Sequence, residues 1–537
     1  MNMRKIIIAA DLLQRVRSRC KKKHNAAAWL IACLFLTIEA VAFLNGATAA
    51  SLHTAFEKSN FIRMTTSAEI SIFLDDISSR YKTSKKQILG KSAQGRPMEA
   101  LFLSKEMVHL FSIPPSPTRL TVMIIGSQHG TEPSGAEAIL ILARDIVDGP
   151  LQSVLNSMNL ILIPNGNPDG RDNYRRVNGN EVNLSTNFIA LSEPETRAIN
   201  DVLIRWRPSV ILDVHESAIF KRKSLALQGY MTNFEAQFET ANNPNIDREI
   251  LDYSREILLS EIIARVEARG LPARHYIGEI TSIHQPIQHG GLSIRNLRNK
   301  AGISGAFSFL LENRLDPPFG DFKTPRNIRV RVDKQYCCIT AFLDVCSRHQ
   351  AEILRRSKAA HQKWRETRSE NLAHLYSSYA CDPARPKISL TLLRLDTGKP
   401  TDLSFDYYGR ITNRHSLEMP AAYLITAHTD EMIRLFGFHH IEYEIITTPT
   451  KFAEGVERIE TAVKNSIRSK QSGCVLADTG SLLIRLRQPA GRLIPLLLEP
   501  LSNSSIFLDP AYSAFIETGK NFFLYRLRDL GPFEKRR

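Results

Sequence analysis

The stretch that decides the fold is GSQHGTEPSG, Gly126 to Gly135. It follows an apolar run rich in β-branched residues, RLTVMIIG, and precedes AEAILILARDIV, whose apolar residues recur with helical spacing. This order predicts a buried strand, a loop and a helix. His129 and Glu132 stand three residues apart on the predicted loop, directly after the strand.

The same alternation of strands and helices continues along the chain. MNLILIPNGNPDG is typical of a strand that runs into turn residues, and EPETRAINDVLIRW of a helix. PSVILDVHES and ISGAFSFLLENR each indicate a further buried strand. Apolar strands separated by helices favour a mixed, mostly parallel sheet with helices on both faces. The sequence therefore predicts an α/β fold, in which ligands bind beyond the carboxyl ends of the strands.

The length of the chain and the changes in its sequence pattern indicate several parts. A chain of 537 residues is too long for one core, so more than one domain is expected. We expect the α/β domain over residues 50–345 and a helical linker over 346–382, where the charged stretch from His349 to Ala380 indicates helix. Short β-like runs alternating with turns predict a smaller β-rich domain over 383–537.

Residues 1–49 have the three parts of a secretory signal. A basic segment precedes the apolar run AAAWLIACLFLTIEAVAFL, and small residues follow, with Ala47 and Ala49 at the A-x-A positions of a cleavage site. The clean apolar part, Ala26 to Ile38, is short for a membrane span, and Glu39 interrupts the run. We therefore expect a secreted or periplasmic protein, with a membrane anchor or tether through this segment as the alternative.

The pattern of charges argues against a nucleic-acid-binding protein, and the cysteine spacing argues against a zinc knuckle or a redox motif. Residues 1–49 carry eight Lys or Arg and two Asp or Glu, so without them the net charge falls from +15 to +9. No run of Lys and Arg is interleaved with aromatic residues, so nucleic acid is not an expected partner. The remaining cysteines have no C-x-x-C spacing, which argues against a zinc knuckle or a redox motif.

Four ionisable residues are expected on one rim of the sheet, because each lies where a predicted strand ends: His129, Glu132, His215 and Glu312. Two imidazoles and one carboxylate are a known ligand set of hydrolytic zinc sites, which keep a fourth position open for water. His129, Glu132 and His215 are therefore candidate ligands of one Zn²⁺ ion per chain. Asp213 could orient a ligand imidazole. Taken alone, H-x-x-E also fits a loop histidine followed by a Glu that favours a helix N-terminus.

Four motifs in sequence order resemble the zinc carboxypeptidase family, carboxypeptidase A-like: HGTEPSG, NGNPDGRDNYRRVNGNEVNL, ILDVHES and FSFLLENR. The resemblance covers roughly residues 60 to 345 and is nearest to bacterial members with an N-P-D-G-R segment. GRLIPLLLEP, much less specifically, resembles the accessory region of some bacterial members. The resemblance implies the zinc ligands named above. It also implies that Glu312 is the general base and that Arg176 polarises the scissile carbonyl, with the adjacent Arg175 as the alternative.

One segment departs from the pattern of that family. Where the family has DLNRNF or DLNRD, this chain has NLSTNF, Asn183 to Phe188. In the family an Asn–Arg pair at these positions grips the C-terminal carboxylate of the substrate, and hydroxyl groups do not replace a bidentate guanidinium–carboxylate pair. The candidates for substrate contact are Ser185, Thr186, Asn187 and, from a basic loop before the fourth strand, Arg295, Arg298 and His289.

The sequence thus predicts an exported, zinc-dependent, carboxypeptidase-like hydrolase that cleaves peptides. A zinc-dependent amidase or deacylase on the same fold is the first alternative, favoured by the missing carboxylate clamp. The second is a non-catalytic binding protein whose hydrolase core has drifted; the presence of all three candidate ligands and the candidate base argues against it.

Overall fold

The computed structural model describes residues 52–107, 111, 119–218, 223–315, 328–366, 372–462, 466–472, 474–516, 521–528 and 530. The predicted signal over residues 1–49 lies outside the described residues. Residues 54–537 form one compact unit. Within the described residues, none of the helices is both long enough and apolar enough to cross a membrane.

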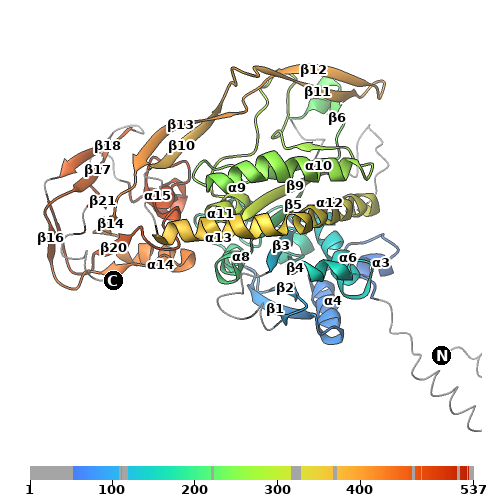
Figure 1. The fold of residues 1–537 in the computed structure, drawn as a ribbon, viewed down its shortest axis with the longest axis horizontal. Coiled ribbons are helices and arrows are strands. Elements are labelled where there is room, and N and C mark those ends of the chain that lie inside the picture. Colours follow the sequence, from blue (N-terminus) through green and yellow to red (C-terminus); the bar gives the residue numbers. More distant parts are fainter. Residues whose placement is uncertain are drawn as a thin grey trace, which may run out of the picture. The chain divides into compact units, whose positions relative to one another are not determined.

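An eight-stranded mixed sheet forms the core of this unit (Figure 1), with the strand order β1-β2-β4-β3-β5-β9-β7-β8. Its central neighbours β4, β3, β5 and β9 run parallel to one another, whereas β1, β2 and β7 pair antiparallel with their neighbours toward the centre. This confirms the predicted mixed, mostly parallel sheet. The strands are β1 (Ser84–Lys91), β2 (Pro97–Leu103), β3 (Leu120–Gly126), β4 (Met158–Ile163), β5 (Val210–Ala218), β7 (Ala236–Thr240), β8 (Ala273–His275) and β9 (Phe307–Leu315).

Helices cover the sheet, as expected for strands that are apolar on both faces (Figure 1). Every residue of β3 and β4 is buried. On one face Met123 and Ile125 pack in a cluster with Val202 of α8 and Leu297 of α11. The helices of this part are α3 (Ala55–Lys58), α4 (Ser67–Arg80), α6 (Ser134–Asp148), α7 (Pro168–Asp172), α8 (Pro194–Trp206), α9 (Arg248–Tyr253), α10 (Leu259–Glu267), α11 (Leu297–Ile303), α12 (Ile328–Arg348) and α13 (Gln350–Glu366).

The C-terminal region is rich in strands, drawn in orange and red in Figure 1. A six-stranded sheet has the order β15-β20-β14-β21-β17-β18, and β10-β13 and β16-β19 form two-stranded ribbons. The strands are β10 (Leu372–Ala380), β11 (Lys387–Arg394), β12 (Pro400–Asp406), β13 (Arg410–Glu418), β14 (Ala422–Ile425), β15 (Glu444–Ile445), β16 (Thr450–Phe452), β17 (Val456–Ala462), β18 (Ser466–Ser472), β19 (Val475–Ala477), β20 (Leu482–Arg485) and β21 (Asn521–Leu527). The helices here are α14 (Thr429–His439), α15 (Leu493–Leu498) and α16 (Pro510–Ser513).

A third small sheet joins the two halves of the chain. Strand β11 pairs with β12 and also, antiparallel, with β6 (Tyr230–Thr232), with Leu393 opposite Met231. Side chains of both halves share the cluster beneath it, among them Phe234 and Phe405. The predicted β-rich region after residue 383 therefore contributes strands to a sheet that begins in the α/β part.

The helical linker predicted over 346–382 is only partly helical. Helix α13 is present, but residues 372–380 form strand β10, so the helix expected there is wrong. In LAHLYSSYA the residues Ala373, Leu375 and Ser377 are buried, with less buried residues between them. This two-residue period suits a strand, and pairing with β13 stabilises it.

The glycines of the Gly126–Gly135 loop are there because other backbone segments and side chains approach closely. A Cβ atom on Gly130 would lie 2.0 Å from the carbonyl carbon of Gly170, and one on Gly135 would lie 2.7 Å from Cγ1 of Val214. Since α7 carries Gly170 and β5 carries Val214, these contacts lock the loop against two other elements. The loop that carries His129 and Glu132 is thus fixed before any ligand binds.

The change Gly130→Ala is expected to destabilise the protein, because the new methyl group meets backbone that no rotamer change can move. Overpacking of this kind costs about 1 to 3 kcal/mol of the free energy of unfolding. The midpoint of urea unfolding, followed by circular dichroism, measures it. Gly437→Ala is the matched control: no atom lies within 4 Å of its added Cβ, and alanine is favoured over glycine in a helix by up to about 1 kcal/mol. An unchanged midpoint for Gly130→Ala would contradict the proposed close packing.

Candidate metal centre and catalytic cleft

Parallel pairing of three strands brings the candidate residues to one edge of the sheet. In the β3–β5 pair, Gly126 lies opposite Val214, so the loop after β3 stands beside His215. In the β5–β9 pair, His215 lies opposite Glu312. Residues directly opposite one another in a sheet point to the same face. His129, Glu132, His215 and Glu312 therefore gather at the carboxyl edge, although 183 positions separate the first from the last.

Three ligand atoms converge at this edge. His129 Nδ1 lies 2.9 Å from Oε1 of Glu132, and His215 Nδ1 lies 2.9 Å from Oε2 of the same carboxylate. The two Nδ1 atoms are 3.1 Å apart. All three side chains are buried. Ligand atoms spaced in this way surround a point that a single small cation can occupy.

The outer ring nitrogens determine which lone pairs face inward. Nε2 of His215 lies 3.0 Å from the Asp213 carboxylate, and Nε2 of His129 lies 3.0 Å from Oδ1 of Asn183. Both partners are acceptors, so they match the tautomer that is protonated at Nε2, in which each Nδ1 presents a lone pair. Two imidazole lone pairs and a carboxylate then face one another, an arrangement that a bound cation stabilises. The donor set fits zinc, which prefers nitrogen and oxygen ligands of this type.

Further hydrogen bonds hold His215 in place. Gln128 donates to Oδ1 of Asp213 at 2.6 Å, and Gln335 of α12 donates to the carbonyl of His215 at 2.9 Å. The carboxylate that faces His215 Nε2 is thus itself fixed, as is common around metal-ligating histidines.

A buried guanidinium braces the loop that carries His129 and Glu132. Arg171 of α7 donates to the hydroxyl of Ser127 and to the carbonyl of Pro133, at the two ends of that loop. The same guanidinium forms an ion pair with Glu137 in the first turn of α6. Because the pair is buried and fully hydrogen-bonded, it adds positional precision to the loop.

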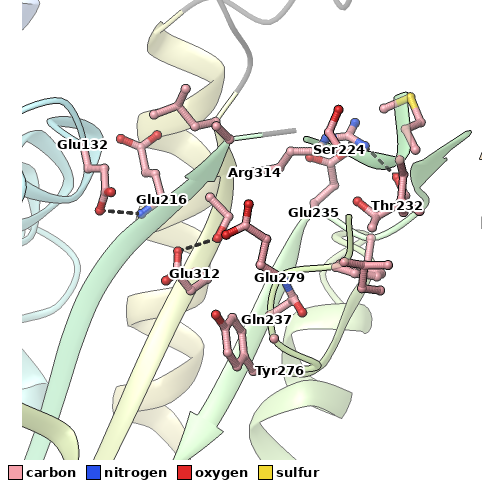
Figure 2. Close-up of a pocket in the computed structure, with 18 of the residues that line it drawn as sticks. Glu132, Glu216, Ser224, Thr232, Glu235, Gln237, Tyr276, Glu279, Glu312 and Arg314 are labelled. Atoms are coloured by element: carbon pink, nitrogen blue, oxygen red, sulfur yellow. Dashed lines mark hydrogen bonds and ion pairs between the residues drawn. The ribbon is translucent and has the colours of Figure 1, made fainter. Parts of the chain in front are cut away.

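Glu312 stands in a cleft of about 390 Å³ beside the three converging ligand atoms. Its Oε2 accepts a hydrogen bond from Ser217 at 2.7 Å. Burial raises the pKa of Glu312 to about 7, and repulsion by the nearby Glu132 carboxylate adds to the effect. Figure 2 shows Glu216 and Glu312 on neighbouring strands with Glu132 on a loop beside them, and Tyr276 and Glu279 approaching from another side of the cleft.

The structure separates the two adjacent arginines. Arg176 lines the cleft, and its Nη1 donates to Oε1 of Glu132 at 2.6 Å while about half of the side chain stays exposed. Arg175 instead forms an exposed ion pair with Glu181. Of the two, Arg176 is the one placed to reach a bound substrate.

The residues predicted to contact the substrate do not line the cleft. The hydroxyl of Ser185 lies 3.0 Å from Nε2 of His129, and the hydroxyl of Thr186 caps the carbonyl of Asn183. Asn187 is buried in contacts with Thr196, Glu193 and Ser192. The described residues that line the cleft with Glu312 do not include Ser185, Thr186, Asn187 or Arg295. Their contact with substrate stays a prediction.

The other two basic candidates belong to a separate polar network. Arg298 donates to Oδ1 of Asn242 and to the carbonyl of Gly291. His289 is bonded through both ring nitrogens, to the carbonyl of Tyr276 and to the hydroxyl of Tyr407, each at 2.7 Å.

Two residues that the sequence did not single out line the cleft. Tyr276 follows the short strand β8, and burial raises the pKa of its phenol, so it remains a hydrogen-bond donor. Glu216 is held in position by a bidentate ion pair with Arg331 of α12, at 2.7 and 2.8 Å. The position of Glu216 directly after His215 is the signal that could have identified it, whereas nothing local marks Tyr276.

A second group of possible ligands consists of Glu239, His275 and His289, of which His275 is only partly buried. The rings of His275 and His289 are stacked, with centroids 3.9 Å apart and planes inclined by 13°. Parallel stacked rings do not point their in-plane lone pairs at one atom, and Glu239 already accepts from His275 and from the backbone of Gly290. This group is a satisfied hydrogen-bond network.

Comparison with known proteins agrees with this geometry. Residues 70–188 match the zinc carboxypeptidase family, peptidase M14. Carboxypeptidase 2 of Trichophyton rubrum is 28% identical over 228 residues, which cover 42% of each chain. Carboxypeptidase SOL1 of Arabidopsis thaliana is 31% identical over 153 residues, 26% of this chain and 30% of that one. The resemblance to zinc carboxypeptidases is confirmed, and the alignments span less than half of each relative.

Solved structures of metallocarboxypeptidases are similar to part of the chain. The metallo-carboxypeptidase from Burkholderia cenocepacia has a TM-score of 0.40 and 16% identity, covering 52% of this chain and 69% of that chain. The carboxypeptidase A from Helicoverpa armigera has a TM-score of 0.42 and 15% identity, covering 57% and 78%.

The change His215→Ala is expected to weaken zinc binding by about 100-fold or more, because it removes one of three converging ligands, and loss of an outer-shell partner alone costs 10- to 100-fold. Titration with zinc against a competing chelator, with metal content measured after dialysis, checks this. His415→Ala, at an exposed position of β13, is the matched control and keeps the affinity of the unmodified protein. Full zinc occupancy in His215→Ala at limiting zinc would contradict the ligand set.

Proposed function

We propose that the chain is an exported zinc-dependent peptide hydrolase of the carboxypeptidase type. The observation that carries the proposal is the convergence of His129, Glu132 and His215 beside Glu312 at the mouth of one cleft. The match of residues 70–188 to zinc carboxypeptidases supports it. The relatives that bear the name carboxypeptidase support peptides as the substrate class.

The three converging side chains would hold one zinc ion per chain. Bound there, zinc supplies Lewis-acid chemistry: it polarises a carbonyl group and makes water more acidic. Glu312 then takes the proton of the attacking water and delivers it to the leaving amine, a role that needs a carboxylate at the cleft surface beside the ligands. Arg176, whose guanidinium is held by Glu132 while about half of its side chain is exposed, stabilises the negative charge that develops on the carbonyl oxygen.

Export to the periplasm or the medium is part of the proposal. It is supported by the basic, apolar and small-residue parts of residues 1–49 and by the cleavage pattern at Ala47 and Ala49.

A zinc-dependent amidase or deacylase is the second candidate function. One observation favours it: at the positions where the family's carboxylate-gripping pair stands, Ser185 bonds His129 and Thr186 caps a backbone carbonyl. Neither side chain can form an ion pair with a substrate carboxylate. Recognition of a free C-terminus would then need another basic side chain, such as Arg176 or Lys223 of the cleft lining.

Peptides of one sequence, with free and with amidated C-termini, distinguish the two functions. Exclusive removal of the last residue from free-ended peptides supports the carboxypeptidase. Equal cleavage of both forms, or release of the terminal amide group, supports the amidase. Loss of all turnover with a chelator, and its return with zinc, is expected in either case, and turnover that is unaffected by a chelator would contradict the metal dependence.

The change Glu312→Gln is expected to lower kcat by about 10² to 10⁴-fold, the usual contribution of a general base. Zinc content should stay at one per chain, because Glu312 is not among the three converging ligands. Steady-state kinetics on a peptide and metal analysis of the same sample measure both. Glu418→Gln, at an exposed position of β13, is the matched control with unchanged kinetics. Normal turnover in Glu312→Gln would show that the base is another residue.

A further inference from the structure

A second cavity, of about 410 Å³, lies at the opposite edge of the central sheet. It is lined by Thr121 at the start of β3, by Ser209 just before β5 and by Ala306 just before β9. The candidate metal ligands lie at the other ends of the same strands. Helix α13, the ends of α8, α11 and α14, and the loop before α15 complete the wall. The cavity has the size of a small-molecule site and is separate from the cleft.

The lining of this cavity is strongly basic. The described residues that line it include no Asp or Glu. Its basic side chains come from six separate segments: Arg119, Arg207, Lys300, Lys358, His361, His439, His440 and Arg492. Three of them have acidic partners beyond the lining, Arg119 with Glu106, His440 with Asp201 and Arg492 with Asp247. The case for an anion therefore depends on the other basic groups, above all on Lys300.

Lys300 is the most informative of these side chains. It lies on α11, is only 3% exposed, and its Nζ is 2.8 Å from Nδ1 of His439. His439 donates through Nε2 to the carbonyl of Ile189 at 2.7 Å, so its Nδ1 is a neutral acceptor. A buried ammonium group with a neutral partner is costly, and burial lowers the pKa of Lys300 to about 7. An anion in the cavity would provide the missing countercharge.

The carboxyl ends of three helices meet at the cavity. Their partial negative charge explains why some of the basic side chains lie there. α8, α11 and α14 all present their carboxyl ends, which carry partial negative charge and favour nearby cations. Arg207 is the residue that ends α8, where its backbone N–H donates to the carbonyl of Leu203. Lys300 is not explained by this effect, because its ammonium reaches a side chain of another helix and not the last carbonyl groups of its own.

Large apolar side chains form much of the rest of the wall. Trp206, Ile211, Ile303, Leu354 and Leu493 line it, from four helices and a strand of the sheet. Trp206 is nearly buried and packs on Phe102, with ring centroids 4.9 Å apart. A cavity with a cationic group at one place and apolar side chains elsewhere suits a ligand that has both characters.

We propose that this cavity binds a small organic carboxylate with an apolar body, its carboxylate at Lys300 and its hydrocarbon part against Trp206 and Ile211. The site would connect the α/β sheet to the C-terminal region, since Lys300 belongs to the first and His439 to the second. It does not depend on zinc or on peptide hydrolysis.

Calorimetric titration of the full-length protein with decanoate tests the proposal, with decanol, acetate and decyl phosphate as comparison ligands. We expect decanoate to bind at least about tenfold more tightly than decanol, because hydrogen bonds to charged groups contribute that much, and more tightly than acetate, because acetate lacks the apolar chain. Decanol binding as tightly as decanoate, or no binding of decanoate, would overturn it. Tighter binding of decyl phosphate would overturn the choice of a carboxylate in favour of a phosphate ester.

Variants locate the site. Lys300→Met, which keeps the length of the side chain and removes its charge, should weaken decanoate binding at least about tenfold. Lys387→Met, at an exposed lysine of β11, is the matched control with unchanged affinity. Leu354→Trp, on the partly exposed helix α13, should also weaken decanoate binding by filling the cavity. This variant replaces Lys300→Met as the test if Lys300→Met does not fold. Unchanged affinity in either folded cavity variant would overturn the site.

Zinc content and peptide turnover are measured on the same variants. Both should equal those of the unmodified protein in Leu354→Trp and Lys300→Met, so a failure of this proposal is distinguishable from a failure of the proposed hydrolase.

Discussion

The Glu132 carboxylate holds the candidate site together. One of its oxygens faces Nδ1 of His129 and Nη1 of Arg176, and the other faces Nδ1 of His215 and the backbone N–H of Glu216. Few single groups in a protein carry that many polar neighbours while buried, and such a cluster is stable only if its charges balance. A bound cation balances two inward lone pairs and a carboxylate.

The structure around this carboxylate maintains its geometry. Arg171 ties both ends of the loop, Gly130 lets the loop lie against α7, and Gln335 and Arg331 attach α12 to the end of β5. These contacts arise within the chain alone. The site is therefore preorganised, which is the condition under which groups that act on a transition state are effective.

Strand register places the fourth residue of the site. His215 and Glu312 are opposite one another on neighbouring parallel strands, so their side chains point to the same face. A shift of β9 by one residue would turn Glu312 to the other face of the sheet. The buried, apolar residues of β9, such as Phe307 and Phe309, oppose such a shift because they would lose their own packing. The hydrophobic core thus fixes the position of a residue proposed to do chemistry.

Much of the fold and of the candidate site could be predicted from the sequence, for a physical reason. A buried parallel strand is an uninterrupted apolar run, so its end is visible, and the residues at strand ends must meet at one edge. The sequence could not separate Arg175 from Arg176, because a loop does not reveal which of two neighbours turns inward. It missed Tyr276 and the helix-to-strand change at residues 372–380, since both depend on partners far along the chain. The basic cavity could not be predicted from the sequence for the same reason, because its lining comes from segments that lie far apart along the chain.

The pairing of β11 with β6 has a consequence for how the protein can be divided. Removing everything after residue 383 would strip β6 of its neighbour β11 and expose Phe234, which packs in a cluster with apolar side chains of β11 and β12. An unpaired edge of this kind invites self-association. The C-terminal region therefore covers an edge that the first half would otherwise expose, and we expect the first half to stay soluble only when both halves are expressed as one chain.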